Sequence, residues 1–369
     1  RSMLIRLFAS VLGAPFSETA SSVAPPAKGR ALVPQAQQEA LPPIIDAHNP
    51  RYKQTWGDTP IMNLVGLEHP VLDHFASLHT ELNIFMWGDS TMKRQFYLLR
   101  GLTGGLSTET APSFQIAVSM PDEKLGANAA VCPDVSVSIH KATFGNATIS
   151  LTLAVCETGA TSIAEVPALL EVLQQKPYEL TLPAGALLYI GGAGLHHLHD
   201  DDRTDAELRG PALPRGWLTM KPLLEAFEDN TKFGLAKLQE QYPKAKLGYF
   251  NTHTIAEEKF FMPSTGARAR AVACASRDSE VCFSGVNVSP EERDSFRDTL
   301  LSRHGTDVMA KRERAVLKDP SLKWTLVDGH KISRDAGSTQ SPDGVHYFEP
   351  TMMQEIEEAL TVLRRDRRL

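Results

Sequence analysis

The chain has 369 residues, of which 42% are hydrophobic and 22% are charged. These values are typical of globular proteins, and the length allows one large domain or two smaller ones. The formal net charge of -6 argues against a general nucleic-acid binder, because such proteins present positive charge to the phosphates. We therefore expect no nucleic acid among the partners.

Residues 1–50 are predicted to form a tail or stem that precedes the folded domain. Pro, Ala, Ser and Gln are abundant in residues 14–50, and the apolar residues there follow no sustained period. The apolar stretch 3–15 is interrupted by Arg6 and is shorter than the roughly 20 residues that span a bilayer. We interpret it as a remnant of a signal or anchor, so that membrane contact would come only through a missing N-terminal anchor. The folded domain is expected over residues 51–369.

Strand-like and helix-like runs alternate along this domain. This alternation predicts an α/β fold with three layers, in which helices cover both faces of a central, mainly parallel sheet. Ligands of such sheets bind at the carboxyl ends of the strands. The expected strands are 82–87, 135–140, 147–155, 186–191, 247–251 and 324–328, and the expected helices are 92–102, 163–175, 218–241, 290–303 and 350–364.

Two further local patterns refine this prediction. Ser289 and Glu292 form the pattern of a capping box at the start of the helix 290–303. The run 333–341 is rich in Gly, Ser and Asp, and we interpret it as a lid.

Ser90 lies between the first predicted strand and the first predicted helix. At a helix N-terminus the free backbone N–H groups and the helix dipole favour negative charge. An acyl-transfer nucleophile needs this environment, because an oxyanion develops next to its Oγ in the transition state. Far downstream, Asp343 and His346 stand three residues apart, before a helix that is expected to begin near Glu349. We predict that Ser90 is a nucleophile, that His346 is its general base and that Asp343 orients the imidazole.

These residues also carry a family resemblance. Gly88-Asp89-Ser90 and Asp343-Gly344-Val345-His346 resemble the first and last blocks of the SGNH/GDSL hydrolase superfamily. They are most similar to its PC-esterase branch, which includes trichome-birefringence-like polysaccharide O-acetyltransferases, the sialate O-acetyltransferase domain and neurexophilin-like PC-esterases. The stretch 188–196 resembles the middle block of that branch. The fit covers roughly residues 55–365, and it implies an SGNH-like fold that needs no cofactor and acts on O-acyl groups of glycans.

One departure from the family concerns the oxyanion hole. Members usually carry an Asn in the middle block, whereas this chain has Gly192 at the corresponding place. The oxyanion would then be held by the backbone N–H of Ser90, by a glycine N–H from Gly192 or Gly194, or by Asn251. The missing Asn also keeps open a non-catalytic glycan-binding or interaction protein that retains the fold.

A second departure concerns the arginine that family members carry three residues after the serine. Here Lys93 occupies that place and Arg94 follows it, and the two point in different directions on a helix. We treat both as candidates for substrate binding, together with His196 and His197 after one strand and His253 after the next. The alternative for the loop around His253 is that its polar side chains satisfy nearby backbone groups.

The loop from His196 to Asp202 offers a rival chemistry, because it contains three histidines and three carboxylates. Such ligands suit zinc or manganese, and a metal-dependent hydrolase is therefore a further alternative. Its spacing matches no strong metal motif, and consecutive residues cannot all converge on one ion, so we expect no metal. The chain has neither a phosphate-binding Gly-x-x-x-x-Gly-Lys loop nor the Gly-x-Ser-x-Gly of the classical α/β hydrolases.

Four cysteines allow two disulfides, which we predict to join Cys132 to Cys156 and Cys274 to Cys282. Four reduced thiols in the core are the alternative. Asn146-Ala147-Thr148 and Asn287-Val288-Ser289 fit acceptor sites for N-glycosylation. Together with the resemblance to glycan-modifying enzymes, these features favour the secretory pathway, in the Golgi lumen or outside the cell.

The sequence thus predicts serine-dependent acyl ester chemistry through an acyl-enzyme. The expected partner is a glycan or another acylated small molecule, with an acyl donor as a second substrate in the case of a transferase. An O-acetyl esterase and an O-acetyltransferase would use the same triad, so both remain open.

Overall fold

A computed structural model provides the structure of this chain. The residues that it describes are 81–103, 135–144, 147–156, 163–175, 180–191, 193–204, 206–260, 266–276, 280–283 and 287–363. The chain divides into two units, Arg1–Asp46 and Ala47–Leu369, and all of the described residues belong to the second unit. The predicted N-terminal tail, Cys132, Asn146 and Gly192 lie outside the described residues.

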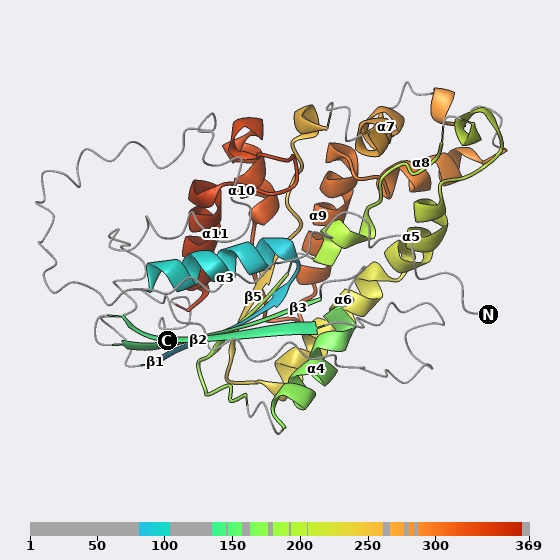
Figure 1. Ribbon diagram of the computed structural model, residues 1–369. Helices are drawn as coiled ribbons and strands as arrows, with labels where there is room; N and C mark the ends of the chain where they lie inside the picture. Colours follow the sequence, from blue (N-terminus) through green and yellow to red (C-terminus); the bar gives the residue numbers. More distant parts are fainter. Residues whose placement is uncertain are drawn as a thin grey trace, which may run out of the picture. The chain divides into compact units, whose positions relative to one another are not determined.

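Six strands in the described ranges form one sheet, in the order β2-β3-β1-β4-β5-β6. Figure 1 shows α3 and α11 on one side of this sheet and α4 and α6 on the other. All neighbours are parallel except β2 and β3, which form an antiparallel pair. The prediction of a mainly parallel sheet is therefore confirmed, and the two runs expected to return beside each other are β2 and β3. The strands are β1 (Glu81–Gly88), β2 (Val135–Phe144), β3 (Ala147–Cys156), β4 (Leu187–Gly191), β5 (Lys246–Phe250) and β6 (Thr325–Val327).

Helices cover both faces of the sheet, as predicted. On one face, α3 and α11 pack on a core that includes Met86 of β1, whereas α4, α6 and α9 pack on the opposite face with Phe85. Successive side chains of a strand point to opposite faces, so both of these neighbours are buried. The α-helices are α3 (Ser90–Leu102), α4 (Val166–Leu173), α5 (Arg215–Glu225), α6 (Phe227–Gln241), α7 (Gly266–Ala275), α8 (Pro290–Asp298), α9 (Arg303–Leu317), α10 (Gly329–Ala336) and α11 (Glu349–Val362).

Short 3-10 helices connect several of these elements: η2 (Ile163–Glu165), η3 (Ala193–His197), η4 (Glu207–Arg209), η5 (Glu257–Lys259), η7 (Glu280–Phe283) and η8 (Ser338–Gln340). No helix in the described ranges is long and apolar enough to cross a membrane.

The predicted helix 218–241 consists of two helices, α5 and α6, which are separated at Ala226. Pro222 lies in the last turn of α5 and cannot donate the N–H that would continue the helical hydrogen bonding from residue 218. The sequence pattern did not show this break, because apolar residues keep a helical period across it.

The predicted helix 290–303 is shorter than expected, because α8 ends at Asp298 and α9 begins at Arg303. Leu301 of the connection donates its N–H to the carbonyl of His199 at 2.8 Å, so this segment pairs with the loop that follows β4. The capping box of Ser289 and Glu292 is confirmed at the start of α8.

The prediction of a flexible lid at residues 333–341 is wrong, because most of this segment is helical. Ser333 belongs to α10, and the segment continues through the 3-10 helix η8. Gly337 separates the two helices with a φ of 77°, a value that favours glycine.

Two glycines bring the carboxyl ends of the central strands into close contact. A Cβ atom on Gly88 of β1 would lie 2.2 Å from the carbonyl oxygen of Gly191, and one on Gly191 would lie 2.2 Å from that of Phe250. Real side chains cannot approach backbone atoms so closely. The ends of β1, β4 and β5 therefore depend on these glycines, and Ser90 follows directly at this edge.

We predict that Gly191→Ala lowers the free energy of unfolding by about 1–3 kcal/mol, the usual cost of overpacking a core. The added methyl group meets backbone of β5, which cannot rotate away as a side chain could. Urea denaturation measures the effect. Gly210→Ala is the control, because its Cβ would meet only the Glu207 carbonyl at 3.9 Å. Equal unfolding free energies for the two variants would contradict the close approach of β4 and β5.

Candidate active site

Ser90 is the first residue of α3 and follows β1 after one residue. Asp89 caps the helix, because its Oδ1 accepts the N–H of Thr91 at 2.8 Å. Its extended backbone turns the chain from strand to helix. The serine therefore occupies the predicted place, at the carboxyl end of a strand and the N-terminus of a helix.

The structure brings the three predicted triad residues together. The Oγ of Ser90 lies 2.7 Å from Nε2 of His346, although 256 positions separate the two residues in the chain. On the other side of the ring, Nδ1 lies 2.7 Å from Oδ2 of Asp343. Both contacts are hydrogen bonds, and they follow the order expected of a nucleophile, a base and an orienting carboxylate.

Asp343 is held in its ionised form. Its Oδ1 accepts the backbone N–H groups of Val345 at 3.1 Å and His346 at 2.8 Å. Burial acts to raise the pKa of Asp343, but the hydrogen bonds and charge of His346 outweigh it and lower the pKa to about 2. An ionised carboxylate can only accept, so Nδ1 of His346 donates to it and Nε2 is left to accept the proton of Ser90.

Ser341 supports the turn that carries Asp343 and His346, and our sequence analysis did not identify it. Its fully buried Oγ donates to the carbonyl of His346 at 2.6 Å and accepts the N–H of Gly344 at 3.0 Å. Gly344 has a φ of 86°, and a Cβ there would lie 2.5 Å from a ring carbon of Phe260. The order Ser-Pro-Asp-Gly, typical of a type I turn, is the signal that could have revealed this role.

The candidates for the oxyanion hole differ in their surroundings. Asn251 is fully buried: its Nδ2 donates to Asp328 at 3.0 Å, and its Oδ1 accepts the N–H of His330 at 3.0 Å. Its amide therefore joins the end of β5 to the start of α10. Gly194 lies in η3, where a Cβ would meet Thr252 Oγ1 at 2.0 Å. Backbone N–H groups, including that of Ser90, remain the better candidates.

The two basic candidates on α3 are both half-buried. Burial lowers the pKa of Arg94 to about 10, while the charges of Asp343, Glu349 and Asp89 oppose the shift. Arg94 is thus within electrostatic reach of the triad carboxylate. Lys93 precedes it in α3, at the position where members of the resembled family carry arginine.

Of the three candidate histidines, His196 is the one that is partly exposed. Its side chain is 36% exposed, and its Nε2 lies 3.5 Å from Oδ2 of Asp89. His197 is buried with its ring edge-to-face on Phe227. His253 is also buried, and its Nε2 is 2.5 Å from Glu355, which in turn accepts from Gln95. His197 and His253 therefore lie in the core.

The side chains of the histidine-rich loop have separate partners. His199 bonds the carbonyl of Asp200 through Nδ1 at 2.8 Å and the hydroxyl of Thr299 through Nε2 at 3.0 Å. Asp202 accepts the N–H of Arg215 at 3.0 Å, at the start of α5. Within the described ranges, no three His, Cys, Asp or Glu side chains are arranged to hold a metal ion.

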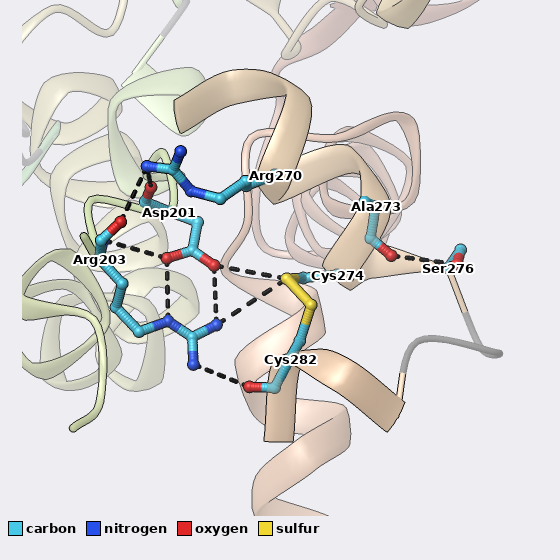
Figure 2. Close-up of a disulfide and its surroundings, with 7 residues drawn as sticks. All are labelled: Asp201, Arg203, Arg270, Ala273, Cys274, Ser276 and Cys282. Atoms are coloured by element: carbon cyan, nitrogen blue, oxygen red, sulfur yellow. Dashed lines mark hydrogen bonds and ion pairs between the residues drawn. A yellow bond between two sulfur atoms is a disulfide. The ribbon is translucent and has the colours of Figure 1, made fainter. Parts of the chain in front are cut away.

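Asp201 of the same loop is buried against a disulfide (Figure 2). Arg203 donates to both of its carboxylate oxygens, at 3.0 and 2.7 Å, and to the carbonyl of Cys282 at 2.8 Å. Cys274 and Cys282 are joined, as predicted, with a Cα–Cα distance of 5.5 Å. The ion pair and the disulfide fasten the loop after β4 to α7 and η7. The predicted partner of Cys156, Cys132, lies outside the described residues.

Glu313 of α9 is a buried acid that the sequence analysis missed. It accepts the N–H of Thr252 at 2.8 Å and the hydroxyl of Tyr249 at 2.9 Å. Burial raises its pKa to about 7, against the effect of these hydrogen bonds. Its neighbours in the chain are lysine and arginines, which indicate a solvated helix face, so the sequence contained no signal for it.

No protein-family model matches this chain, and no curated protein matches it. The resemblance to the PC-esterase branch therefore stays a prediction that rests on three short blocks of sequence.

We predict that Ser341→Ala reduces turnover and lowers the free energy of unfolding by about 1–3 kcal/mol, because it leaves a buried N–H and a buried carbonyl without their partner. Ester hydrolysis and urea denaturation measure the two effects. Thr339→Ala is a matched control, since Thr339 is exposed in the neighbouring η8. Unchanged turnover in a stably folded Ser341→Ala protein would show that the turn does not depend on this hydroxyl.

Proposed function

We propose that this protein is an O-acyl esterase or O-acetyltransferase that acts on a glycan through an acyl-enzyme at Ser90. The single observation that supports it most is the continuous hydrogen-bonded chain from Ser90 through His346 to Asp343, with both distances at 2.7 Å. An ionised carboxylate, an oriented imidazole and a serine at a helix N-terminus together can perform nucleophilic catalysis.

In the first half-reaction, Oγ of Ser90 attacks the carbonyl carbon of the ester while Nε2 of His346 takes its proton. Asp343 stabilises the imidazolium that forms, and backbone N–H groups at the start of α3 stabilise the oxyanion. The tetrahedral intermediate then breaks the bond to the alcohol, which leaves with the proton from His346. Ser90 is now acylated.

In the second half-reaction, the acceptor attacks the acyl carbon and gives its proton to His346. Water as acceptor releases the carboxylic acid, whereas a sugar hydroxyl produces a new ester. Both acceptors regenerate Ser90 when its oxygen leaves with the proton from His346. The same residues therefore serve an esterase and a transferase.

The glycan as substrate is supported by the resemblance of the three sequence blocks alone. An oxidising compartment is supported by the disulfide between Cys274 and Cys282, because structural disulfides persist mainly in secreted proteins. A non-catalytic glycan-binding protein is the second candidate, and the glycine at position 192 favours it. The hydrogen-bonded triad favours the enzyme, since binding alone does not require these three residues in this order.

Ser90→Ala should abolish labelling by a fluorophosphonate probe and lower the rate of p-nitrophenyl acetate hydrolysis by about 10⁴- to 10⁶-fold, as the loss of a triad residue does. Mass spectrometry of the intact protein detects the label. Mass spectrometry of a mixture of the protein with candidate glycans detects acyl transfer. Ser321→Ala is the control, because Ser321 is exposed. Equal labelling of Ser90→Ala and wild type would exclude Ser90 as the nucleophile.

The metal-dependent alternative makes a different prediction. If the triad performs the chemistry, EDTA leaves the hydrolysis rate unchanged, and His199→Ala reduces it far less than His346→Ala, because the side chain of His199 bonds Asp200 and Thr299 rather than the triad. Rates with and without EDTA, followed by added zinc or manganese, provide the measurement. Loss of turnover with the chelator and its return with the metal would move the active site to the loop from His196 to Asp202.

A further inference from the structure

A second imidazole, that of His196, lies close to Asp89, the residue that precedes Ser90. Asp89 is 2% exposed, and its Oδ1 is used to cap α3. Among the described residues, its buried Oδ2 has no hydrogen-bond partner, and Nε2 of His196 forms an ion pair with it at 3.5 Å. Burial of a carboxylate is costly unless a cation is near, so this oxygen requires the charge of His196.

The ion pair between His196 and Asp89 joins the stretch 188–196 to the segment Gly88-Asp89-Ser90. His196 lies in η3, immediately after β4, and β4 is the parallel neighbour of β1. The two strands approach each other so closely at Gly88 and Gly191 that neither can carry a side chain. The ion pair between Asp89 and His196 fastens this junction on the side where Ser90 begins its helix.

The charges around the pair agree with an ionised state. Burial acts to lower the pKa of His196, but Asp89 outweighs it, and the pKa of His196 is raised. Burial acts to raise the pKa of Asp89, yet His196, the N–H of Thr91 and the more distant His346 lower it. Both partners therefore favour the ion pair.

Two titratable groups on the helices packed on η3 have partners of their own. Glu313 of α9 bonds Thr252 and Tyr249, and Lys221 of α5 lies over the ring of Trp217, 5.3 Å from its centre.

We propose, on the basis of the function proposed above, that His196 acts as an imidazolium that neutralises Asp89 and thereby positions Ser90 for attack. It is a positioning residue, since it acts on the nucleophile through Asp89. The reaction then needs two imidazoles in opposite states. His346 is neutral, because it must accept the proton of Ser90, whereas His196 is charged.

This requirement fixes the shape of the pH profile. A group with a raised pKa carries its charge below that pKa and loses it as the pH rises through it. Because the general base must be neutral and His196 must be charged, activity is confined to a pH window, and its decline at alkaline pH reports the loss of the proton of His196. A triad without the second imidazole would keep its activity on the alkaline side.

The test is the rate of fluorophosphonate labelling and of p-nitrophenyl acetate hydrolysis from about pH 5 to about pH 10. We expect a bell-shaped profile for wild type. In His196→Gln, kcat should fall about 10- to 100-fold at neutral pH, because the nucleophile is misplaced. KM should change little, and the decline of activity at alkaline pH should be absent. His196→Lys retains a cation and should restore most of the rate and move the decline to a higher pH.

His304→Gln is the matched control, because His304 also pairs with an aspartate, Asp298, but lies exposed on α9. It should keep the bell-shaped profile. If His196→Gln retains both the wild-type rate and the decline of activity at alkaline pH while Ser90 is still labelled, the inference is overturned and the proposed function stands. If wild-type Ser90 is not labelled at all, the proposed function fails.

An NMR titration of the imidazoles in Ser90→Ala keeps the inference testable should the His196 variants fold poorly. We expect the signal of His196, assigned by its loss in His196→Gln or by sequential assignment, to show an imidazolium at neutral pH. It should lose its proton over the pH range in which wild-type activity declines. A neutral His196 at pH values of full activity would overturn the proposal.

Discussion

The close backbone contact between β1, β4 and β5 at their carboxyl ends is the constraint on which the rest of the site depends. Gly88 and Gly191 leave no space for a side chain between these strands, so the residues that follow each strand emerge at nearly the same place. Ser90 follows β1, and His196 follows β4. The parallel sheet thus determines which parts of the sequence meet, and the turns after the strands carry the polar residues of the candidate site.

Buried polar groups hold the helices and loops behind this edge. Glu355 of α11 accepts from Gln95 of α3 and is paired with His253 after β5, so one carboxylate joins three segments. Glu313 of α9 likewise joins its helix to β5 and to the loop that follows it, because it bonds Tyr249 and Thr252. Such buried hydrogen bonds favour one arrangement of the core, because removing one partner leaves a buried polar group unsatisfied.

The parts of the structure that the sequence predicted are those with local signals. An apolar run followed by Gly-Asp-Ser indicates a strand, a turn and a helix, and Asp343 and His346 lie three residues apart on one turn, so the triad could be inferred without coordinates. The fold class followed from the alternation of strands and helices. The disulfide of Cys274 with Cys282 followed from their short separation.

The parts that the sequence did not predict depend on partners far away in the chain. Asn251 looks like a site residue at the end of a strand, but its amide bonds Asp328 and His330. The break between α8 and α9 coincides with the pairing of Leu301 with His199. No local sequence pattern predicts this pairing. The helix α10 replaces an expected lid, because a composition rich in Gly, Ser and Asp does not by itself exclude a helix.

The 256 positions between Ser90 and His346 have a consequence for synthesis of the chain. The ribosome adds residues in order, so the serine and its helix leave the ribosome long before the histidine has been made. During this time the strands of the sheet can form, but the imidazole of His346 is not yet available to Ser90. A nascent chain that ends before His346 therefore lacks this partner of Ser90, and the hydrogen bond between the two residues can form only after residue 346 has been made.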